Sequence, residues 1–313
     1  MARKKIVLVG AGNIGGTLAH LAGLKELGDI VLFDVVDGLP QGKALDLAQS
    51  SPVEDFDARI AGANHYRALK GADVVIVTAG IARKPGMSRD DLIATNAGIV
   101  KSVTENIIQH SPNAIILIVS NPLDVMSYCA YLTAKIDSSR VFGMAGILDT
   151  ARFRAFLAEA LDVSPKDIQT VLMGGHGDTM VPLPRYTTVA GIPVTELIAE
   201  DKLTAIIERT KKGGGEIVNL LGTSAWYAPG AAAAQMVEAI VRDQKRIFPC
   251  CVWLQGEYGL KDIYLGVPVK LGKKGIEEII ELQLNDEEKK LLEQSATSVR
   301  EVMGVFDGMN VVS

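Results

Sequence analysis

Cysteine is scarce in this chain of 313 residues, which holds only Cys129, Cys250 and Cys251. So few cannot build a disulfide framework, and we expect them to be small core side chains in a protein of the reducing cytoplasm. Long apolar runs are also missing, because the longest, such as residues 74–82 and 114–119, are far too short to cross a bilayer. The charged residues 1–5 lead directly into the first expected strand, which leaves no room for a signal peptide.

Blocks of positive charge are absent as well. The net charge is −5 with no basic stretch, so the chain lacks the electrostatic footprint of a nucleic-acid-binding protein. No cluster of cysteine, histidine and carboxylate has metal-ligand spacing, and no serine stands in a nucleophile elbow, which argues against metal or covalent catalysis. The chain does have 48% hydrophobic and 22% charged residues, which is enough for a sizeable core in one large or two smaller domains.

A glycine-rich turn organises the N-terminal half. The apolar run at residues 6–9 ends in Gly10-Ala11-Gly12-Asn13-Ile14-Gly15, and helix-forming residues follow. A strand, a tight glycine turn and a helix in this order let main-chain N–H groups approach a pyrophosphate at the helix N-terminus. The next apolar run, residues 30–33, closes with Asp34, where a ribose-binding carboxylate belongs. The alternative, an ordinary turn with a surface aspartate, is the weaker interpretation in this context.

Strands and helices alternate through this half. Strands are expected at residues 6–9, 30–33, 58–61, 72–78, 114–119 and 141–143, with helices at 38–49, 90–109 and 123–134. This α/β series predicts a Rossmann-type, doubly wound parallel sheet with right-handed crossovers. Ligands bind beyond the carboxyl ends of such strands, so Gly10, Asp34, residues 78–80 and residues 119–121 should converge on one crevice.

The pattern changes after about residue 145. Helices are expected at residues 148–161, 205–221, 231–243 and 286–302, and strands at 167–173, 250–254, 263–268 and 276–284, the last three antiparallel. We therefore predict a dinucleotide-binding domain at residues 1–146 and an α+β substrate domain at residues 147–313. No linker or repeat separates the halves, so they should pack tightly together.

His176 is the histidine best placed for chemistry. It follows a buried-type strand, and three nearby glycines leave its imidazole accessible. An imidazole can take or give a proton near neutral pH, although a plain turn histidine is the alternative. The other three histidines, His20, His65 and His110, are expected to be structural.

Asp149 and Arg152 stand three residues apart on an expected helix and therefore share a face. One interpretation is a local surface ion pair. The other is that Asp149 orients His176, while Arg152 holds a substrate carboxylate in its planar, two-pronged geometry. Spacing alone leaves both interpretations open.

The loop at residues 81–89 carries Arg83, Lys84 and Arg89 between an expected strand and an expected helix. It is either a solvated basic loop or a lid, hinged near Gly80 and Gly86, that brings arginines onto an anionic substrate and excludes water.

Together these motifs resemble the lactate/malate dehydrogenase family over essentially the whole chain. The matching pieces are residues 10–15, Asp34, Thr78-Ala79-Gly80, residues 83–89, Val119-Ser120-Asn121-Pro122, Asp149-Thr150-Ala151-Arg152 and Gly175-His176-Gly177-Asp178. Several ordered motifs at these separations are far more specific than any single one.

The resemblance implies a role for each site residue. His176 would exchange a proton with the substrate oxygen, and Asp149 would hold its ring. Arg152 would grip the carboxylate next to the reacting carbon, Arg89 would polarise the carbonyl, and Asn121 would also reach the substrate. The implied cofactor is NAD, since a carboxylate at Asp34 would repel the extra phosphate of NADP. The residues implied to bind the cofactor are Gly10, Ala11, Gly12, Asn13, Ile14, Gly15, Asp34, Asn96, Val119, Ser120 and Asn121.

Arg83 is implied to decide the substrate. Lactate enzymes place glutamine at the matching position, whereas a second cation suits a four-carbon dicarboxylate. We therefore expect reversible oxidation of (S)-malate to oxaloacetate, a step of the tricarboxylic acid cycle. The alternatives are an L-lactate or other 2-hydroxyacid dehydrogenase and a non-catalytic NAD-binding paralogue.

The loop at residues 220–230 is shorter than in some relatives, so we assign no catalytic role to Thr223 or Ser224. Trp226 and Tyr227 are expected in the core or at an interface. The resemblance also implies a homodimer or homotetramer, with no nucleic-acid or membrane partner.

Overall fold

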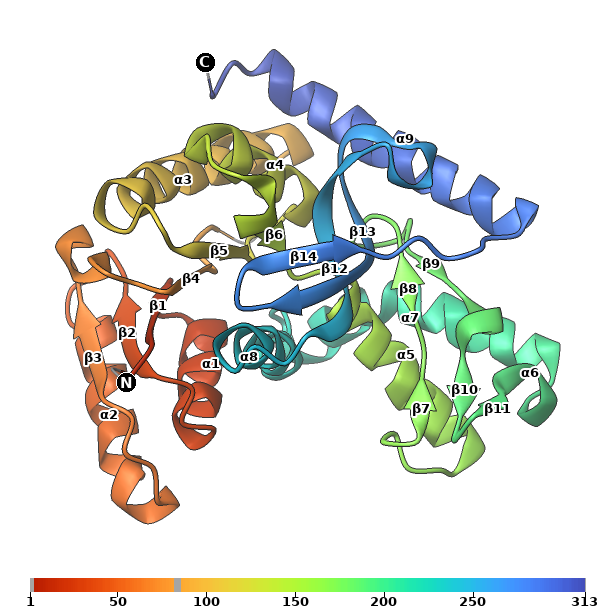
Figure 1. The fold of residues 1–313 in the computed structure, drawn as a ribbon, viewed down its shortest axis with the longest axis horizontal. Coiled ribbons are helices and arrows are strands. Elements are labelled where there is room, and N and C mark those ends of the chain that lie inside the picture. Colours follow the sequence, from red (N-terminus) through yellow and green to blue (C-terminus); the bar gives the residue numbers. More distant parts are fainter. Residues whose placement is uncertain (1–2, 82–85, 313) are drawn as a thin grey trace.

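The computed structural model describes residues 3–81 and 86–312, and its centre is a nine-stranded sheet in the order β14-β13-β12-β6-β5-β4-β1-β2-β3 (Figure 1). The six strands that come first in the chain, β1 to β6, pair in parallel, as predicted. They are β1 (Lys5–Val9), β2 (Asp29–Phe33), β3 (Ile60–Ala63), β4 (Val74–Val77), β5 (Ile115–Ile118) and β6 (Val141–Gly143). Every residue of β4 and β5 is buried, because helices cover both faces of the sheet.

The helices of this half confirm the doubly wound fold. They are α1 (Asn13–Leu24), α2 (Leu39–Glu54), α3 (Arg89–His110) and α4 (Leu123–Ala134). In Figure 1, α3 and α4 lie on one face of the parallel strands, and α1 lies on the other with α8 (Tyr227–Val241) from the second half of the chain. The carboxyl ends of β1, β2, β4 and β5 therefore meet at one edge of the sheet, above the starts of these helices.

The second half supplies more helices and several short strands. The remaining helices are α5 (Gly146–Leu161), α6 (Val194–Leu197), α7 (Glu200–Leu221) and α9 (Asp286–Gly308). Short 3-10 turns occupy Tyr66–Leu69, Ser138–Arg140, Pro184–Tyr186 and Glu257–Gly259. One small sheet pairs β7 (Ile168–Gln169), β10 (Thr188–Val189) and β11 (Ile192–Pro193), and another pairs β8 (Leu172–Met173) with β9 (Val181–Pro182).

Two details of the predicted strands are wrong. The strand predicted at residues 167–173 is divided between β7 and β8, which belong to different sheets. The strand predicted at residues 276–284 is shorter in the structure, where β14 covers only Gly275–Ile279. Periodicity marks the apolar residues of these segments, but it does not reveal a chain that changes sheets within a few residues.

The antiparallel strands of the second half continue the sheet of the first half. The long strands β12 (Arg246–Gln255) and β13 (Lys261–Gly272) pair with each other, and Cys251 of β12 pairs with Gly143 of β6. The buried hydroxyl of Tyr264 in β13 donates to the carbonyl oxygen of Val141, at 2.9 Å. One hydrophobic core consequently runs through both halves, as the absence of a linker predicts. The predicted boundary after residue 146 falls at the first turn of α5.

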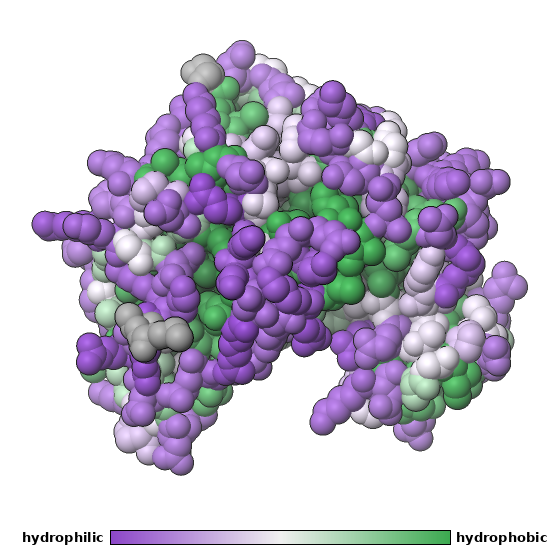
Figure 2. Space-filling view, viewed as in Figure 1, coloured by the Kyte–Doolittle hydropathy of each residue, from purple (hydrophilic) through white to green (hydrophobic). Residues whose placement is uncertain are grey.

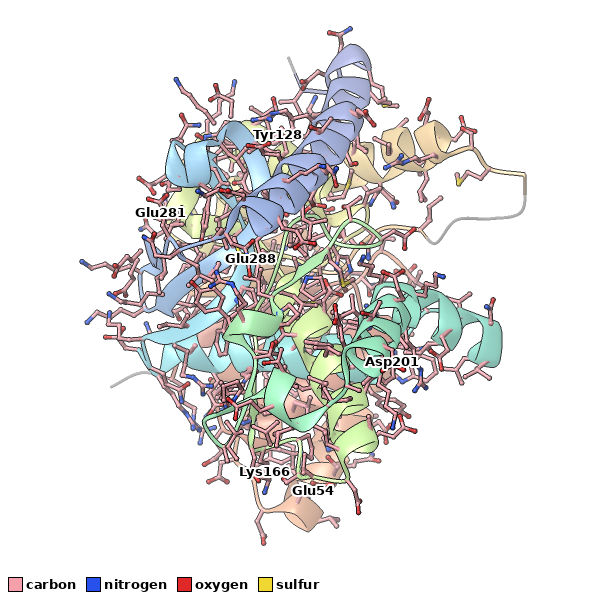
Figure 3. The ribbon with its side chains drawn as sticks, turned by 90° about the vertical axis from the view of Figure 1, so that its right-hand side faces the viewer. Glu54, Tyr128, Lys166, Asp201, Glu281 and Glu288 are labelled. Carbon is pink, nitrogen blue, oxygen red and sulfur yellow. The ribbon has the colours of Figure 1, made fainter. Side chains whose placement is uncertain are left out.

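A smaller second core lies under α5, where Phe153 and Leu157 pack on Ile168, Leu172 and Leu203. This core fixes α5, which carries two of the predicted site residues. The helix α9 lies across the side of the molecule shown in Figure 3, where Glu288 is labelled near its first turn. Glu288 completes a capping box with Asn285 and pairs with Arg185, at 2.8 Å.

The molecular surface is mostly polar. In Figure 2, hydrophilic side chains cover most of the face in view, and apolar ones show in the recesses between them. Within residues 3–81 and 86–312, no helix combines the length and the apolar character needed to cross a bilayer.

Candidate active site

The glycine loop (residues 10–15) joins the carboxyl end of β1 to α1. Gly10 has a φ of +109°, which favours glycine, and a Cβ on Gly15 would lie 2.0 Å from the Gly10 carbonyl oxygen. Gly12, the N-cap of α1, has nothing within 4 Å of the place where a Cβ would stand. Gly10 and Gly15 are therefore required by the turn itself, whereas Gly12 keeps the surface of the loop open.

Asp34 is tied directly to this loop. Its Oδ2 accepts the Ala11 N–H at 2.7 Å, and its Oδ1 accepts the Val36 N–H at 3.0 Å. Lys43 of α2 reaches the same place, where its Nζ donates to the Gly12 carbonyl oxygen at 2.8 Å. Burial lowers the pKa of Lys43, and the charge of Asp34 partly offsets that effect. Lys43 was not among the residues expected from the sequence, where a cation shortly after Asp34 is the signal that could have found it.

A cavity of about 390 Å³ opens over the glycine loop and Asp34. Its lining combines the ends of β1, β2 and β4 with the loop before α8, and consists of Val9, Gly10, Gly12, Asn13, Ile14, Phe33, Asp34, Val35, Thr78, Ala79, Gly80, Ile99, Thr223, Ser224, Ala225 and Trp226. The predicted convergence is therefore confirmed for Gly10, Asp34 and residues 78–80, whereas residues 119–121 do not line this cavity. Trp226 belongs to this lining, and Tyr227 is 71% exposed, so Tyr227 does not belong to the core.

A second cavity, of about 710 Å³, adjoins the first and shares Ile14, Ser224 and Ala225 with it. Val119 and Asn121 line it from the end of β5, and Arg152 and His176 line it from the second half of the chain. The two cavities together span the edge of the sheet where parallel strands end. A ligand long enough to occupy both would reach from Asp34 to His176.

Asp149 lies behind the second cavity and joins two of the polar residues that line it, His176 and Arg152. Its Oδ2 lies 2.8 Å from His176 Nδ1, and its Oδ1 accepts from Arg152 Nη1 at 3.0 Å. The Asp149 residue is 1% exposed, so the pair with Arg152 is not the surface ion pair considered from the sequence. The short Nδ1 contact leaves Nε2 as the ring nitrogen available to a ligand in the cavity.

The charges around His176 set its protonation. Burial alone would lower the pKa of His176, but the bonded Asp149 carboxylate, aided by Asp124, outweighs burial and the repulsion from Arg152. The net result is a pKa above the ordinary histidine value. A histidine held this way keeps its proton to a higher pH than a free imidazole would.

Arg152 is packed against glycines of α7. A Cβ on Gly213 would lie 3.3 Å from Arg152 Cδ, and one on Gly214 would lie 3.6 Å from Nη2. The Arg152 Nε is buried, and no hydrogen-bond partner for it exists among the residues that the structure describes. The guanidinium thus keeps donors beyond the one used by Asp149, in a space that larger residues of α7 would close.

Arg89 is placed apart from Arg152. It is the first residue of α3, after a capping box between Ser88 and Asp91, and it is exposed. A third cavity, of about 390 Å³, joins it to the other side of His176, with Asp124 and Asp178 in the lining. Arg83, the residue expected to select the substrate, lies outside the described residues.

Four of the expected cofactor residues lie behind the cavity linings rather than on them: Ala11, Gly15, Asn96 and Ser120. Asn96 is 1% exposed. Its side-chain oxygen accepts the Ile81 N–H, and its side-chain nitrogen donates to the carbonyl oxygens of Ile81 and Asn121. Ser120 Oγ donates to the carbonyl oxygens of Val77 and Ala79. These side chains hold the strand ends in place and do not face either cavity.

The glycine loop, the acid on the next strand and the cavity beyond them define a dinucleotide-binding α/β protein, in which a half-buried histidine of the adjoining cavity is paired with a buried carboxylate. The comparison with known families makes this specific. The model of the lactate/malate dehydrogenase NAD binding domain matches residues 4–143, and that of the alpha/beta C-terminal domain matches residues 147–305. The chain belongs to the lactate/malate dehydrogenase family.

Individual relatives are similar over nearly their full length. A malate dehydrogenase of Cytophaga hutchinsonii is 61% identical over 97% of this chain and 98% of its own. The solved malate dehydrogenase of Salinibacter ruber has a TM-score of 0.94 and 53% identity, covering 97% of this chain and 98% of its own. A lactate dehydrogenase of Eimeria maxima, solved with NADH and oxamate, has a TM-score of 0.95 and 47% identity, covering 99% and 96%.

The glycine loop yields a stability prediction. Gly15→Ala should lower the free energy of unfolding by about 3 kcal/mol or more, because its Cβ would overlap a main-chain oxygen. Gly12→Ala is the matched control and should change it by less than about 1 kcal/mol, the typical cost of alanine at a helix N-cap. Urea unfolding followed by circular dichroism measures both, and equal losses would contradict the close approach at Gly15.

Proposed function

We propose that the chain is an NAD-dependent malate dehydrogenase that oxidises (S)-malate reversibly to oxaloacetate. The observation that carries this proposal is the His176–Asp149–Arg152 cluster in a cavity that adjoins the glycine-loop cavity. The cluster combines a proton carrier, its orienting carboxylate and a carboxylate-binding cation. Relatives at 61% and 56% identity are named malate dehydrogenase, which supports the substrate class.

The residues present fit NAD. The open surface at Gly12 admits a pyrophosphate beside the N-terminus of α1, and Asp34 presents a carboxylate in the same cavity. Asp34 would bind the ribose hydroxyls and repel the phosphate of NADP, while Val119 and Asn121 would hold the nicotinamide half. Bound NAD would supply the hydride acceptor of the oxidation.

The protein's own contribution is proton exchange and charge. In malate oxidation, neutral His176 accepts the hydroxyl proton at Nε2, and the resulting imidazolium is stabilised by Asp149 through Nδ1. In oxaloacetate reduction, His176 starts protonated and returns that proton to the carbonyl oxygen. Because Asp149 raises the pKa of His176, the protonated form persists to a higher pH than in a free imidazole, and the reduction weakens as the pH rises through that pKa.

In this proposal, the two carboxylates of the substrate and the arginines that would bind them select malate. Arg152 would hold the carboxylate next to the reacting carbon, Arg89 would polarise the carbonyl, and Arg83 would hold the second carboxylate. With pyruvate, the Arg83 guanidinium would be enclosed without a partner, which a closed site penalises strongly. The alternative, an L-lactate or other 2-hydroxyacid dehydrogenase, has support in the Eimeria maxima structure, which is similar throughout.

A paired assay tests the substrate and the cofactor. We expect kcat/KM for oxaloacetate with NADH to exceed that for pyruvate by about a hundredfold or more, the cost of one unpaired enclosed charge. NADH should likewise be preferred to NADPH. Arg83→Gln should shift the oxaloacetate-to-pyruvate ratio towards pyruvate, and an unchanged ratio, or faster turnover of pyruvate by the native chain, would refute the substrate assignment.

His176→Ala tests the proton carrier. The variant should lose at least about a thousandfold in kcat in both directions, since general acid–base catalysis supplies gains of this order. NADH binding, followed by fluorescence, should stay within a factor of about two, because the glycine loop and Asp34 line the first cavity and His176 does not. His110→Ala is the control, at the far end of α3, and should retain the native activity. Loss of NADH binding in His176→Ala would show a structural role instead.

A homo-oligomer, dimer or tetramer, completes the proposal, together with a cytoplasmic location and division of the chain into domains at residues 146 and 147. Exposed apolar side chains on and beside α2, and at the start of α8, support the oligomer: Leu45, Val53, Val35, Val36 and Tyr227. The three free, buried cysteines suit a reducing compartment.

Sedimentation velocity tests the oligomer. The native chain should sediment as a dimer or tetramer, and Leu45→Asp combined with Val53→Asp should shift it towards the monomer, because charges would then enter an apolar contact. Leu291→Asp on α9, which is exposed to a lesser degree, is the control and should leave the assembly intact. A monomeric native chain would contradict the proposal.

A further inference from the structure

A second carboxylate lies beneath His176. Asp124 stands in the first turn of α4 and is 8% exposed. Its Oδ2 accepts the main-chain N–H of His176 at 3.1 Å, and its Oδ1 accepts from the Cys251 thiol of β12 at 3.2 Å. Two carboxylates therefore hold His176, Asp149 of α5 at the ring and Asp124 of α4 at the main chain.

The turn that carries His176 is fixed through three successive N–H groups. Gly174 donates to the Gly266 carbonyl oxygen of β13 at 2.8 Å, and Gly175 donates to Ser295 Oγ of α9 at 2.8 Å. The third N–H, that of His176, donates to Asp124. Asp124 is the only charged group among the three acceptors. The helix α4 is itself braced by α9, where Tyr128 meets Phe306 with ring centres 5.7 Å apart.

The contacts of Asp124 favour its ionised form. Each of its two oxygens accepts a hydrogen bond, from an N–H and from a thiol, and a carboxylate satisfies both donors at once. Burial raises the pKa of Asp124 and the Asp149 charge adds to the rise, while the His176 charge and these two donors act against it without cancelling it. Burial also raises the Cys251 pKa well above its ordinary value, so the thiol stays protonated and able to donate.

We propose that Asp124 is a positioning residue for His176, which anchors its main chain and whose negative charge favours the protonated imidazole. The inference rests on the proposed role of His176 in proton exchange. Asp124 itself neither gains nor loses a proton in the reaction, because it contacts the main chain and not the ring. The other charged groups around His176 come from three places. Asp149 and Arg152 belong to α5, and Arg89, Asp178 and Glu301 line the third cavity. Lys211, Lys212 and Glu216 of α7 line the second cavity.

Asp124→Asn is the sharpest test. Asparagine keeps the size of the side chain and an oxygen for the His176 N–H, but it removes the charge. Without that charge, the imidazolium is less favoured and the pKa of His176 falls. Reduction of oxaloacetate needs protonated His176 and oxidation of malate needs the neutral form. We therefore expect the midpoints of both kcat/KM pH profiles to move down together by about one pH unit.

Ser295→Ala is the matched control. It removes the hydrogen bond to the neighbouring N–H of Gly175 and changes no charge. It should lower the rate equally at every pH and leave both midpoints in place. If Asp124→Asn also leaves both midpoints in place, Asp124 is only a structural contact and the proposal is overturned.

The experiments distinguish a failure of the proposed function from a failure of the role proposed for Asp124. A native chain without oxaloacetate reduction refutes the proposed function, whereas native pH profiles that Asp124→Asn does not shift refute only the role of Asp124. Circular dichroism and NADH fluorescence check that the variant folds. If it does not, infrared spectroscopy of the native protein at pH 8 decides, since a protonated carboxyl gives its own C=O band. The buried Asp149 and Glu288 are paired with arginines, so such a band would place the proton on Asp124 and overturn the proposal.

Discussion

The burial of Asp149 is the constraint on which the rest of the site depends. A carboxylate with 1% exposure is strongly unfavourable unless its oxygens are paired, and here Arg152 and His176 take one oxygen each. The pairing requires α5 to lie beside the turn that carries His176, and the second core beneath α5 holds it there. Loss of either partner would leave a buried charge uncompensated, so the stability of this region and its chemistry depend on the same contacts.

The same sharing shapes how a substrate would bind. Arg152 gives Nη1 to Asp149 but keeps its buried Nε and Nη2, which face space cleared by the glycines of α7. A substrate carboxylate could therefore bind to Arg152 without displacing Asp149. His176 stays oriented throughout, because both its ring and its main chain are held by carboxylates of different helices. The site is thus organised before a ligand arrives, which limits the reorganisation that catalysis requires.

The parallel half of the fold could be predicted because buried strands such as Val74–Val77 and Ile115–Ile118 are continuous apolar runs that end in polar or glycine residues. The rule that ligands bind at strand ends then placed Gly10 and Asp34 together. The continuation of the sheet by β12 and β13 could not be predicted, since pairing between distant strands leaves no local pattern. Asp124 could not be predicted for a similar reason. It stands at the start of an apolar helix, and its partner Cys251 is distant in the sequence and close only in the fold.

Shape alone does not choose between malate and lactate in this family. The relatives from Salinibacter ruber and Eimeria maxima carry different substrate names, yet both match the chain with TM-scores near 0.95. Arg152, His176 and Asp149 would serve either substrate, because both have a carboxylate beside the carbon that is oxidised. The two substrates differ in one further carboxylate, so discrimination needs one further cation at the right distance. In our proposal that cation is Arg83, and its effect is large because an unpaired charge in a closed site costs more than any loss of fit.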